Sequence, residues 1–265
     1  APPADRDAEQ APLTPPPEPS ASGQLALRFA LRRGSDAGIL LHGLFEQLDF
    51  TAPNWPRLLE PLLRRSALVG AEQQPALIDW LSDCLHSPHS ALHGDSAPMT
   101  LAQLAPARTL RECAFHFTLN QAALAQLGRL LARERGAARL WLPGPPQLEG
   151  MMHGFIDLIF EWQGRFYLAD YKSSHLGNSF GDYQLPQLAR HMAAHYYDLQ
   201  YLIYLVALRR FLRLRLADFD DSQLGGAWYL FLRGMPEAGV YFARPSDALL
   251  DALDQLFEEA RHVAA

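Results

Sequence analysis

Two aspartates and a lysine stand within one short stretch whose other residues mostly favour β-strands. Asp157 precedes a predicted turn, and Asp170 and Lys172 follow it. Two carboxylates in largely apolar surroundings repel each other and resist leaving water, and a divalent cation between them offsets both costs. A lysine on the same face could pair with an anionic substrate or hold a water. These residue types therefore indicate metal-assisted chemistry on an anion.

A β-hairpin is the element that must position these side chains. Residues 151–172 read MMHGFIDLIFEWQGRFYLADYK, with strand-forming residues on both sides of a Gln163-Gly164 turn signal. If these two residues form the loop, the antiparallel register sets Asp157 directly opposite Asp170. Facing residues have Cβ atoms roughly 4.5–5.5 Å apart and share one face of the sheet. A slip of one residue would send one aspartate to the other face.

Alternation along the hairpin predicts two largely apolar faces, and a sheet of this kind is covered on both sides. The aspartates are expected on one face with Phe155, Ile159, Glu161, Phe166, Leu168 and Lys172. The other face is expected to carry Ile156, Leu158, Phe160, Trp162, Tyr167, Ala169 and Tyr171. The alternative is that Asp170 and Lys172 merely flank a strand end, with Asp157 in a solvated gap.

Composition argues against several classes of protein. The longest apolar run, around residues 202–208, is far shorter than the roughly 18 residues of a membrane span, and no secretory signal pattern is present. Cys84 and Cys113 cannot build a disulfide framework and are expected to stay reduced in the cytoplasm. A net charge of −6 argues against DNA binding by bulk electrostatics. A polyanion would therefore be met locally, at a metal site, or be delivered by partners.

The chain begins with a segment that is not expected to fold. Residues 1–23 are rich in Pro, Ala, Ser and Glu, which is typical of a linker or a disordered lead-in. Residues 24–265 are expected to form the folded domain. A chain that starts in this way is expected to be one domain of a longer protein.

The first convincing helix is predicted over residues 36–48, DAGILLHGLFEQL. His42 and Glu46 are four positions apart and share a face. Taken alone, a histidine near an apolar face is more often a hydrogen-bonded core residue than a ligand. Glu46 is equally well explained as a solvated residue of the helix.

Residues 53–110 are expected to be helical, with breaks at Pro75, Pro88 and Pro98, and to form an insertion packed against the core. Three histidines lie in or beside a loop of Ser, Pro and Gly. Their irregular spacing favours a plain surface loop over a metal site. They are His86, His89 and His93.

The longest helix is expected over residues 190–214, with Tyr197, Gln200, Tyr201 and Tyr204 on adjoining faces. An aromatic stripe at this spacing is usually core. Its end carries a basic patch that could contact nucleic-acid backbone or a partner, or form a solvated helix end. The patch consists of Arg209, Arg210, Arg213 and Arg215. The other expected elements are a strand over 111–119, a helix over 120–135, a loop over 173–188, strands over 226–233 and 240–243, and a helix over 246–263.

Residues 154–174, GFIDLIFEWQGRFYLADYKSS, and residues 195–212, HYYDLQYLIYLVALRRFL, carry a family resemblance. They resemble the RecB family of nuclease domains within the PD-(D/E)xK superfamily, over residues 38–265 in all. The resemblance implies an α/β fold of the restriction-endonuclease type, a mixed central β-sheet flanked by helices, with the helical insertion. It also implies metal-dependent hydrolysis of DNA phosphodiester bonds.

The resemblance also implies a set of metal ligands. His42, within LLHGLFE, matches a metal-binding histidine of the family's first helix. With it, Asp157, Asp170 and the backbone carbonyl of Tyr171 would hold Mg²⁺. Oxygen-rich ligation suits this hard cation, and one imidazole also admits Mn²⁺. Glu46 matches the acidic position of the same helix and would support these ligands.

Three further residues receive roles from the resemblance. Lys172 would steady the attacking water or the charge that develops in the transition state. Gln200 and Tyr204 match a QxxxY pattern that borders the active site in this family. They are expected to contact the scissile strand or Lys172 and to take no part in the chemistry.

The implied setting is a RecBCD-type helicase-nuclease that processes DNA ends in recombinational repair. The expected partners are single-stranded and duplex DNA ends, RecC-like and RecD-like subunits, RecA, and a helicase region that precedes this segment; no membrane is expected. The chain has no phosphate-binding Gly-Lys loop, so any motor is expected outside it.

Two alternatives come from other classes. The domain could be an inactive nuclease-like docking or regulatory module, although every acidic and basic position of the motif is filled here. An iron-sulfur nuclease of the Cas4 type would need four thiolates, and two cysteines cannot supply them.

Overall fold

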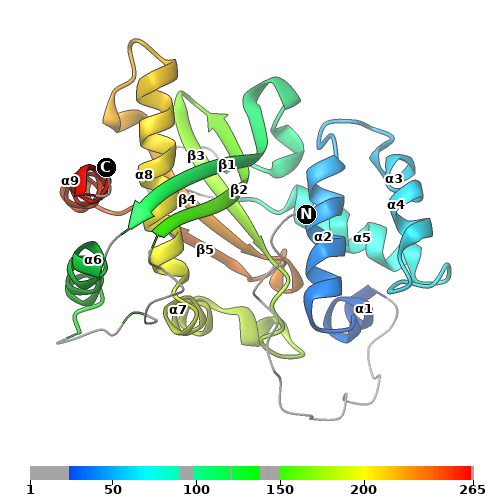
Figure 1. Ribbon diagram of the computed structural model, residues 1–265. Coiled ribbons are helices and arrows are strands. Elements are labelled where there is room, and N and C mark those ends of the chain that lie inside the picture. Colours follow the sequence, from blue (N-terminus) through cyan, green and yellow to red (C-terminus); the bar gives the residue numbers. More distant parts are fainter. Residues whose placement is uncertain (1–23, 90–97, 120, 138–141, 143–149, 264–265) are drawn as a thin grey trace.

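The computed structural model describes residues 24–89, 98–119, 121–137, 142 and 150–263 (Figure 1). The predicted linker over residues 1–23 and the histidine at position 93 lie outside this part of the chain.

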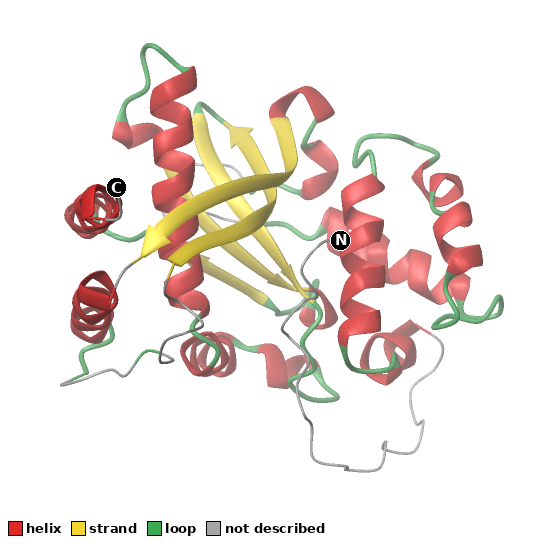
Figure 2. Cartoon of the chain, viewed as in Figure 1, coloured by secondary structure: helices red, strands yellow, loops and turns green. Residues whose placement is uncertain are grey.

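A five-stranded sheet lies at the centre, in the order β1-β2-β3-β4-β5 (Figure 2). Pairing is antiparallel between β1 and β2, β2 and β3, and β4 and β5, whereas β3 and β4 are parallel. The sheet is therefore mixed and flanked by helices, which confirms the predicted fold class. The strands are β1 (Thr109–Leu119), β2 (Gly150–Trp162), β3 (Arg165–Lys172), β4 (Leu224–Phe231) and β5 (Val240–Ala243).

The predicted hairpin register is confirmed where the strands pair. Trp162 faces Arg165, and the same register continues to Leu158 opposite Ala169. The two loop residues at positions 163 and 164 have φ values of 51° and 76°. Positive φ at both central residues is the conformation that matches the right-handed twist of the flanking strands.

One side of the sheet packs against the helices that follow β1, β3 and β5. They are α6 (Gln121–Glu134), α7 (Leu185–Ala194), α8 (Tyr197–Arg215) and α9 (Asp247–Val263). Their apolar residues form a core with Ile159 and Leu168 of the sheet, here the α8-side core. Helix α8 crosses this face (Figure 1). In α9, Ser246 caps the start of the helix, because its hydroxyl accepts a hydrogen bond from the Leu249 backbone N–H.

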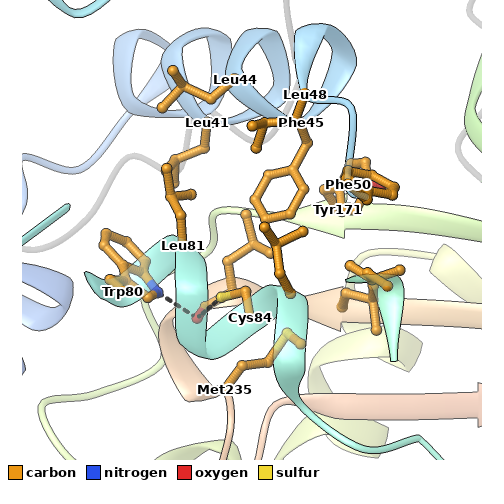
Figure 3. Packing of buried hydrophobic residues seen from close by; sticks show 14 of the residues in the cluster. Leu41, Leu44, Phe45, Leu48, Phe50, Trp80, Leu81, Cys84, Tyr171 and Met235 are labelled. Atoms are coloured by element: carbon orange, nitrogen blue, oxygen red, sulfur yellow. Dashed lines mark hydrogen bonds between the residues drawn. The ribbon is translucent and has the colours of Figure 1, made fainter. Parts of the chain in front are cut away.

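The other side of the sheet packs against the N-terminal helices, and this set of buried residues is the α2-side core. It includes Leu41, Leu44, Phe45, Trp80 and Tyr171, shown in Figure 3. The helices are α1 (Gln24–Ala30), α2 (Ser35–Gln47), α3 (Trp55–Leu58), α4 (Glu60–Arg65) and α5 (Gln74–His86). Short 3₁₀ helices complete the described elements: Leu101–Gln103, Pro106–Arg108, Phe180–Tyr183, Asp221–Gln223 and Leu232–Gly234.

Regular alternation places Ile156 and Leu158 on one face, and the structure shows that this expectation is wrong. Leu158 packs in the α2-side core and Ile156 in the α8-side core. In the neighbouring strand β1, the side chains also change face at the same level. Arg111 donates to two backbone carbonyls of α2, whereas Cys113 packs against the α8-side core. Glu112 lies between them with a φ of 49°, so a local irregularity redirects the side chains that follow.

Three other predictions need correction. The single helix expected over residues 190–214 is divided into α7 and α8, because Tyr196 adopts a left-handed conformation with a φ of 57°. The loop expected over 173–188 contains a 3₁₀ helix and the start of α7. His89 does not belong to a surface loop. It is 3% exposed, its backbone forms a bridge with Met99, and burial lowers the pKa of its imidazole to about 4.

The basic patch at the end of α8 is mostly neutralised within the fold. Arg209 pairs with Asp251 and Asp254, and Arg210 pairs with Asp254. Arg213 pairs with Asp221 and Asp254 as well. These arginines therefore join α8 to α9 and to the 3₁₀ helix before β4. A membrane-crossing helix is likewise not found among the described residues, since none is both long and apolar enough.

We predict that Phe45→Ala lowers the free energy of unfolding by about 3–5 kcal/mol, the usual cost of emptying a buried aromatic site. Phe45 is fully buried and stacks on Tyr171 with ring centroids 4.6 Å apart. Urea denaturation followed by circular dichroism measures the change. Ile39→Ala on the same helix is the control, because Ile39 is 60% exposed and its loss should change stability by less than about 0.5 kcal/mol. Equal effects of the two changes would contradict the packing described.

Candidate active site

The end of β3 delivers the acidic and basic side chains of the predicted motif. Asp170 and Lys172 are 3% and 4% exposed, and Lys172 Nζ lies 2.8 Å from Asp170 Oδ1. The parallel strand β4 places Tyr229 beside Asp170 in the register. The two charged groups are therefore held together inside the domain.

Aromatic rings surround the lysine. Lys172 Nζ lies 4.0 Å from the centroid of the Tyr197 ring and 5.5 Å from that of Tyr229. A ring face attracts a cation, and the attraction is stronger where water is excluded. The rings and Asp170 together stabilise the charged ammonium at a depth that would otherwise favour the neutral amine.

Asp157 and His42 meet on the other side of the motif. His42 Nδ1 lies 3.4 Å from Asp157 Oδ2, and the same oxygen accepts a hydrogen bond of 2.8 Å from the Tyr171 backbone N–H. Helix α2 carries His42 to this point because Phe45, three residues later, stacks on the Tyr171 ring. The edge of the His42 ring also faces Tyr171, with centroids 6.1 Å apart. The α2-side core thus fixes the histidine against the motif.

Burial and neighbouring charge shift the acidity of the motif. The pKa of Asp170 is raised to about 7, with burial as the largest cause; the charge of Asp157 adds to this rise, whereas Lys172 and His42 act in the opposite direction. Asp157 and Asp170 are therefore close enough to repel each other electrostatically. The lysine alone does not restore the ordinary acidity of the buried carboxyl.

Glu112 is a site residue that the sequence analysis missed. Burial, with the charges of Asp157 and Glu46, raises the pKa of this half-buried carboxyl to about 7, while His42 acts to lower it. Glu112 is also the residue of β1 with a φ of 49°. The only signal in the sequence was an acidic residue among the β-formers of the strand that pairs with β2.

Gln200 and Tyr204 belong to a hydrogen-bonded chain that leads toward Asp170. The Gln200 side-chain amide donates to the Tyr204 hydroxyl and accepts from the Tyr229 hydroxyl, both at 2.9 Å. Burial first, and the charge of Asp170 next, raise the pKa values of Tyr204 and Tyr229 well above the usual range for tyrosine. These hydrogen bonds join α8 to β4. The expected contact of Gln200 and Tyr204 with DNA stays a prediction.

Glu46 lies near this group without a close contact to the motif among the interactions described. Its side chain is exposed, and its backbone carbonyl accepts a hydrogen bond from Arg111. Its negative charge reaches Glu112, whose pKa it helps to raise. Its predicted support of the metal ligands stays a prediction.

The donor set fits a divalent cation in charge and chemistry. Asp157, Asp170, Glu112 and His42 bring oxygen and nitrogen donors to one region, and two of the carboxyls have pKa values raised to about 7. Such shifts mark a site with more negative charge than its cations offset. Within the described residues, no group of three or more His, Cys, Asp and Glu side chains is close enough to hold one ion. The shared ligation by His42, Asp157 and Asp170 therefore stays a prediction.

The fold and this motif define a nuclease domain. The family model of the PD-(D/E)XK nuclease superfamily matches residues 20–265, and the chain belongs to this superfamily. The match confirms the resemblance expected from the β2–β3 hairpin and from α8.

Curated relatives make the resemblance more specific. The chain is 38% identical over 237 residues to the RecBCD enzyme subunit RecB of Escherichia coli (strain K12), covering 85% of this chain and 19% of the relative. It is 34% identical over 235 residues to the subunit of the same name from Haemophilus influenzae, covering 86% and 19%. The Mycobacterium tuberculosis relative is 33% identical over 272 residues, covering 88% and 24%. The chain spans roughly a fifth of the length of these relatives.

We predict that, in a chelator, the contribution of Asp170 to the stability of the fold falls as the pH rises from about 4 to about 7. Asp170 has a pKa of about 7 in the folded state, against its ordinary value of 3.8, so this carboxyl holds its proton in the folded state across this window. Stability then decreases with rising pH, because it increases only where the unfolded state binds more protons. Asp170→Asn should reduce this slope, as measured by urea denaturation at pH 5 and pH 7.5.

Asp49→Asn is the matched control for this measurement. Hydrogen bonds from Thr51 lower the pKa of the Asp49 carboxyl, so its own titration window lies below pH 4. The substitution should therefore change stability by the same amount at pH 5 and at pH 7.5. A slope that Asp170→Asn leaves unchanged would show that Asp170 does not hold its proton in the folded state.

Proposed function

We propose that this chain is a metal-dependent deoxyribonuclease domain that hydrolyses phosphodiester bonds in DNA. The observation that carries the proposal is the buried pair of Asp170 and Lys172, beside Asp157 and His42, on a domain of the PD-(D/E)XK superfamily. A structural role alone does not require a lysine and an aspartate to be removed from water at the end of a strand.

His42, Asp157, Asp170 and the backbone carbonyl of Tyr171 would hold Mg²⁺, or Mn²⁺ in its place. When bound, the cation would lower the pKa of a water and offset charge on the phosphate. The raised carboxyl pKa values support the proposal, because a bound cation would return these groups to their ionised forms.

The other polar side chains take separate parts in this proposal. Lys172 presents a fixed ammonium that orients the attacking water and stabilises the negative charge developing on the phosphate. Glu112, with a pKa of about 7, can accept the proton of that water at Oε near neutral pH. Gln200 and Tyr204 hold Tyr229 and thereby the wall of the lysine site.

The relatives suggest the wider setting. Each is a RecB subunit of a RecBCD enzyme, so we propose that this domain acts on single-stranded and duplex DNA ends in an enzyme of the exodeoxyribonuclease V type. RecC-like and RecD-like subunits, a helicase region of the same protein and RecA would be its partners in DNA repair and recombination. The proposal includes a cytoplasmic location, in keeping with free cysteines at positions 84 and 113.

We predict that Lys172→Ala lowers the rate of DNA hydrolysis by at least about 10²–10³-fold, the usual effect of removing one group that stabilises developing charge. Binding of Mn²⁺ should persist in this variant, because the lysine is not a ligand. Asp170→Ala should lose both hydrolysis and the heat of Mn²⁺ binding. Hydrolysis of labelled oligonucleotides and isothermal titration calorimetry measure the two properties.

Arg64→Ala is the control for lost positive charge, because Arg64 is an exposed residue of α4 that pairs with Glu60 on the same helix. It should hydrolyse DNA at the rate of the unchanged chain. Circular dichroism establishes that each variant is folded. Hydrolysis that survives Lys172→Ala would refute the role of the lysine. A folded, unchanged chain that binds DNA without hydrolysing it would favour the inactive docking module.

A further inference from the structure

We propose that His116, His153 and Phe155 form a stacking platform for the unpaired bases next to the scissile phosphate. The platform lies on β1 and β2, on the part of the ribbon that leads away from Asp157. This inference rests on the proposed nuclease function and specifies which form of DNA the site prefers.

The register of the two strands brings the three rings together. His116 faces His153, and Ala114 faces Phe155, so the four side chains share one face of the ribbon. The ring centroids of the two histidines are 4.5 Å apart, and His153 meets Phe155 edge to face at 4.7 Å. The rings therefore form one continuous aromatic surface.

This surface is open to solvent. His116 and His153 are exposed, and Phe155 is only partly buried. Among the described residues, Phe155 belongs to neither the α8-side nor the α2-side core. Phe155 is not a single scattered surface residue, because its ring continues the aromatic surface of the two histidines. A contiguous exposed aromatic surface near an active site is suited to holding a ligand.

The reverse face of the ribbon is already filled. Phe115 packs edge to face against Tyr204 of α8, with centroids 4.9 Å apart, and Ile156 is buried in the α8-side core. A side chain at Gly154 would bring its Cβ within 2.4 Å of the Phe115 ring, so the glycine leaves the space that this ring occupies. The ribbon is thus fixed to α8 from behind, and the platform keeps its outward orientation.

The spacing along β2 suits an extended strand of DNA. Phe155 and His153 precede Asp157 by two and four residues along β2, and two residues of a strand span about 7 Å. This span is comparable to the reach of a single extended nucleotide. A strand whose phosphate lies at Asp157 and Asp170 can therefore place successive bases over Phe155 and over the histidine pair.

Stacking, more than charge, suits the composition of this chain. The net charge is −6, and the arginines at positions 209, 210 and 213 are paired within the fold. Every base presents a π-face, so an aromatic platform holds single strands with little regard to sequence. Paired bases in a duplex are stacked on each other and cannot use it.

The test is steady-state hydrolysis of short oligonucleotides by the unchanged chain and by the double variant His153→Ala with Phe155→Leu, in Mg²⁺. We expect KM for single-stranded DNA to rise about tenfold with kcat nearly unchanged, since each stacked base contributes about 1–3 kcal/mol. KM for blunt duplex DNA should stay within about twofold. Leu214→Ala is the control, because Leu214 is an 85% exposed apolar residue at the far end of α8.

An abasic substrate separates stacking from a merely structural effect. Removing the bases on one side of the cut should raise KM about tenfold for the unchanged chain and leave the double variant little affected. An unchanged KM in the variant, an equal loss on duplex DNA, or an equal abasic effect in both proteins would overturn the platform. If the unchanged chain hydrolyses no DNA, the proposed nuclease function itself is refuted. If it does hydrolyse DNA but gives any of the three results above, only the platform is refuted.

Discussion

The ion pair between Asp170 and Lys172 is almost completely removed from water, and the arrangement of the site follows from that burial. Taking two charges out of water costs several kcal/mol for each, and their attraction repays the cost only with good geometry and further polar contacts. Here the tyrosine rings at positions 197 and 229 provide these contacts on the α8 side. Helix α8 is therefore as necessary to the motif as the strand that carries it.

The opposite side of the sheet holds the second half of the site. Asp157 is oriented by the backbone of Tyr171, and His42 is brought to it by a helix that packs on the ring of the same tyrosine. Tyr171 of β3 therefore connects the sheet to α2. Its backbone N–H donates to Asp157, and its side chain packs against the helix that carries His42. The site carries more negative charge than its own cations offset, as the raised pKa values of Asp170 and Glu112 indicate. That excess makes a cation the natural complement of the fold.

Much of this arrangement could be predicted from local sequence. The hairpin register followed from Gln163 and Gly164, because their turn permits one pairing that keeps the apolar residues in register. The position of His42 followed from its helix and from the family resemblance. The predictions that were wrong depended on tertiary structure. Positive φ values at Glu112 and Tyr196 interrupt the regular strand and the long helix, and neither residue is a Gly or Pro that would have signalled the interruption. His89 is buried because a bridge to Met99 folds its segment against Trp228.

The ion pairs that join α8 to α9 have a consequence for how this domain meets a polyanion. The guanidinium groups of Arg209, Arg210 and Arg213 already face carboxylates, so few of them can replace the counterions condensed along DNA. The affinity of a protein for DNA declines with ionic strength in proportion to the phosphates that its cations neutralise. These three arginines should therefore release few counterions when the chain associates with DNA, and they should add little to the salt dependence of that association.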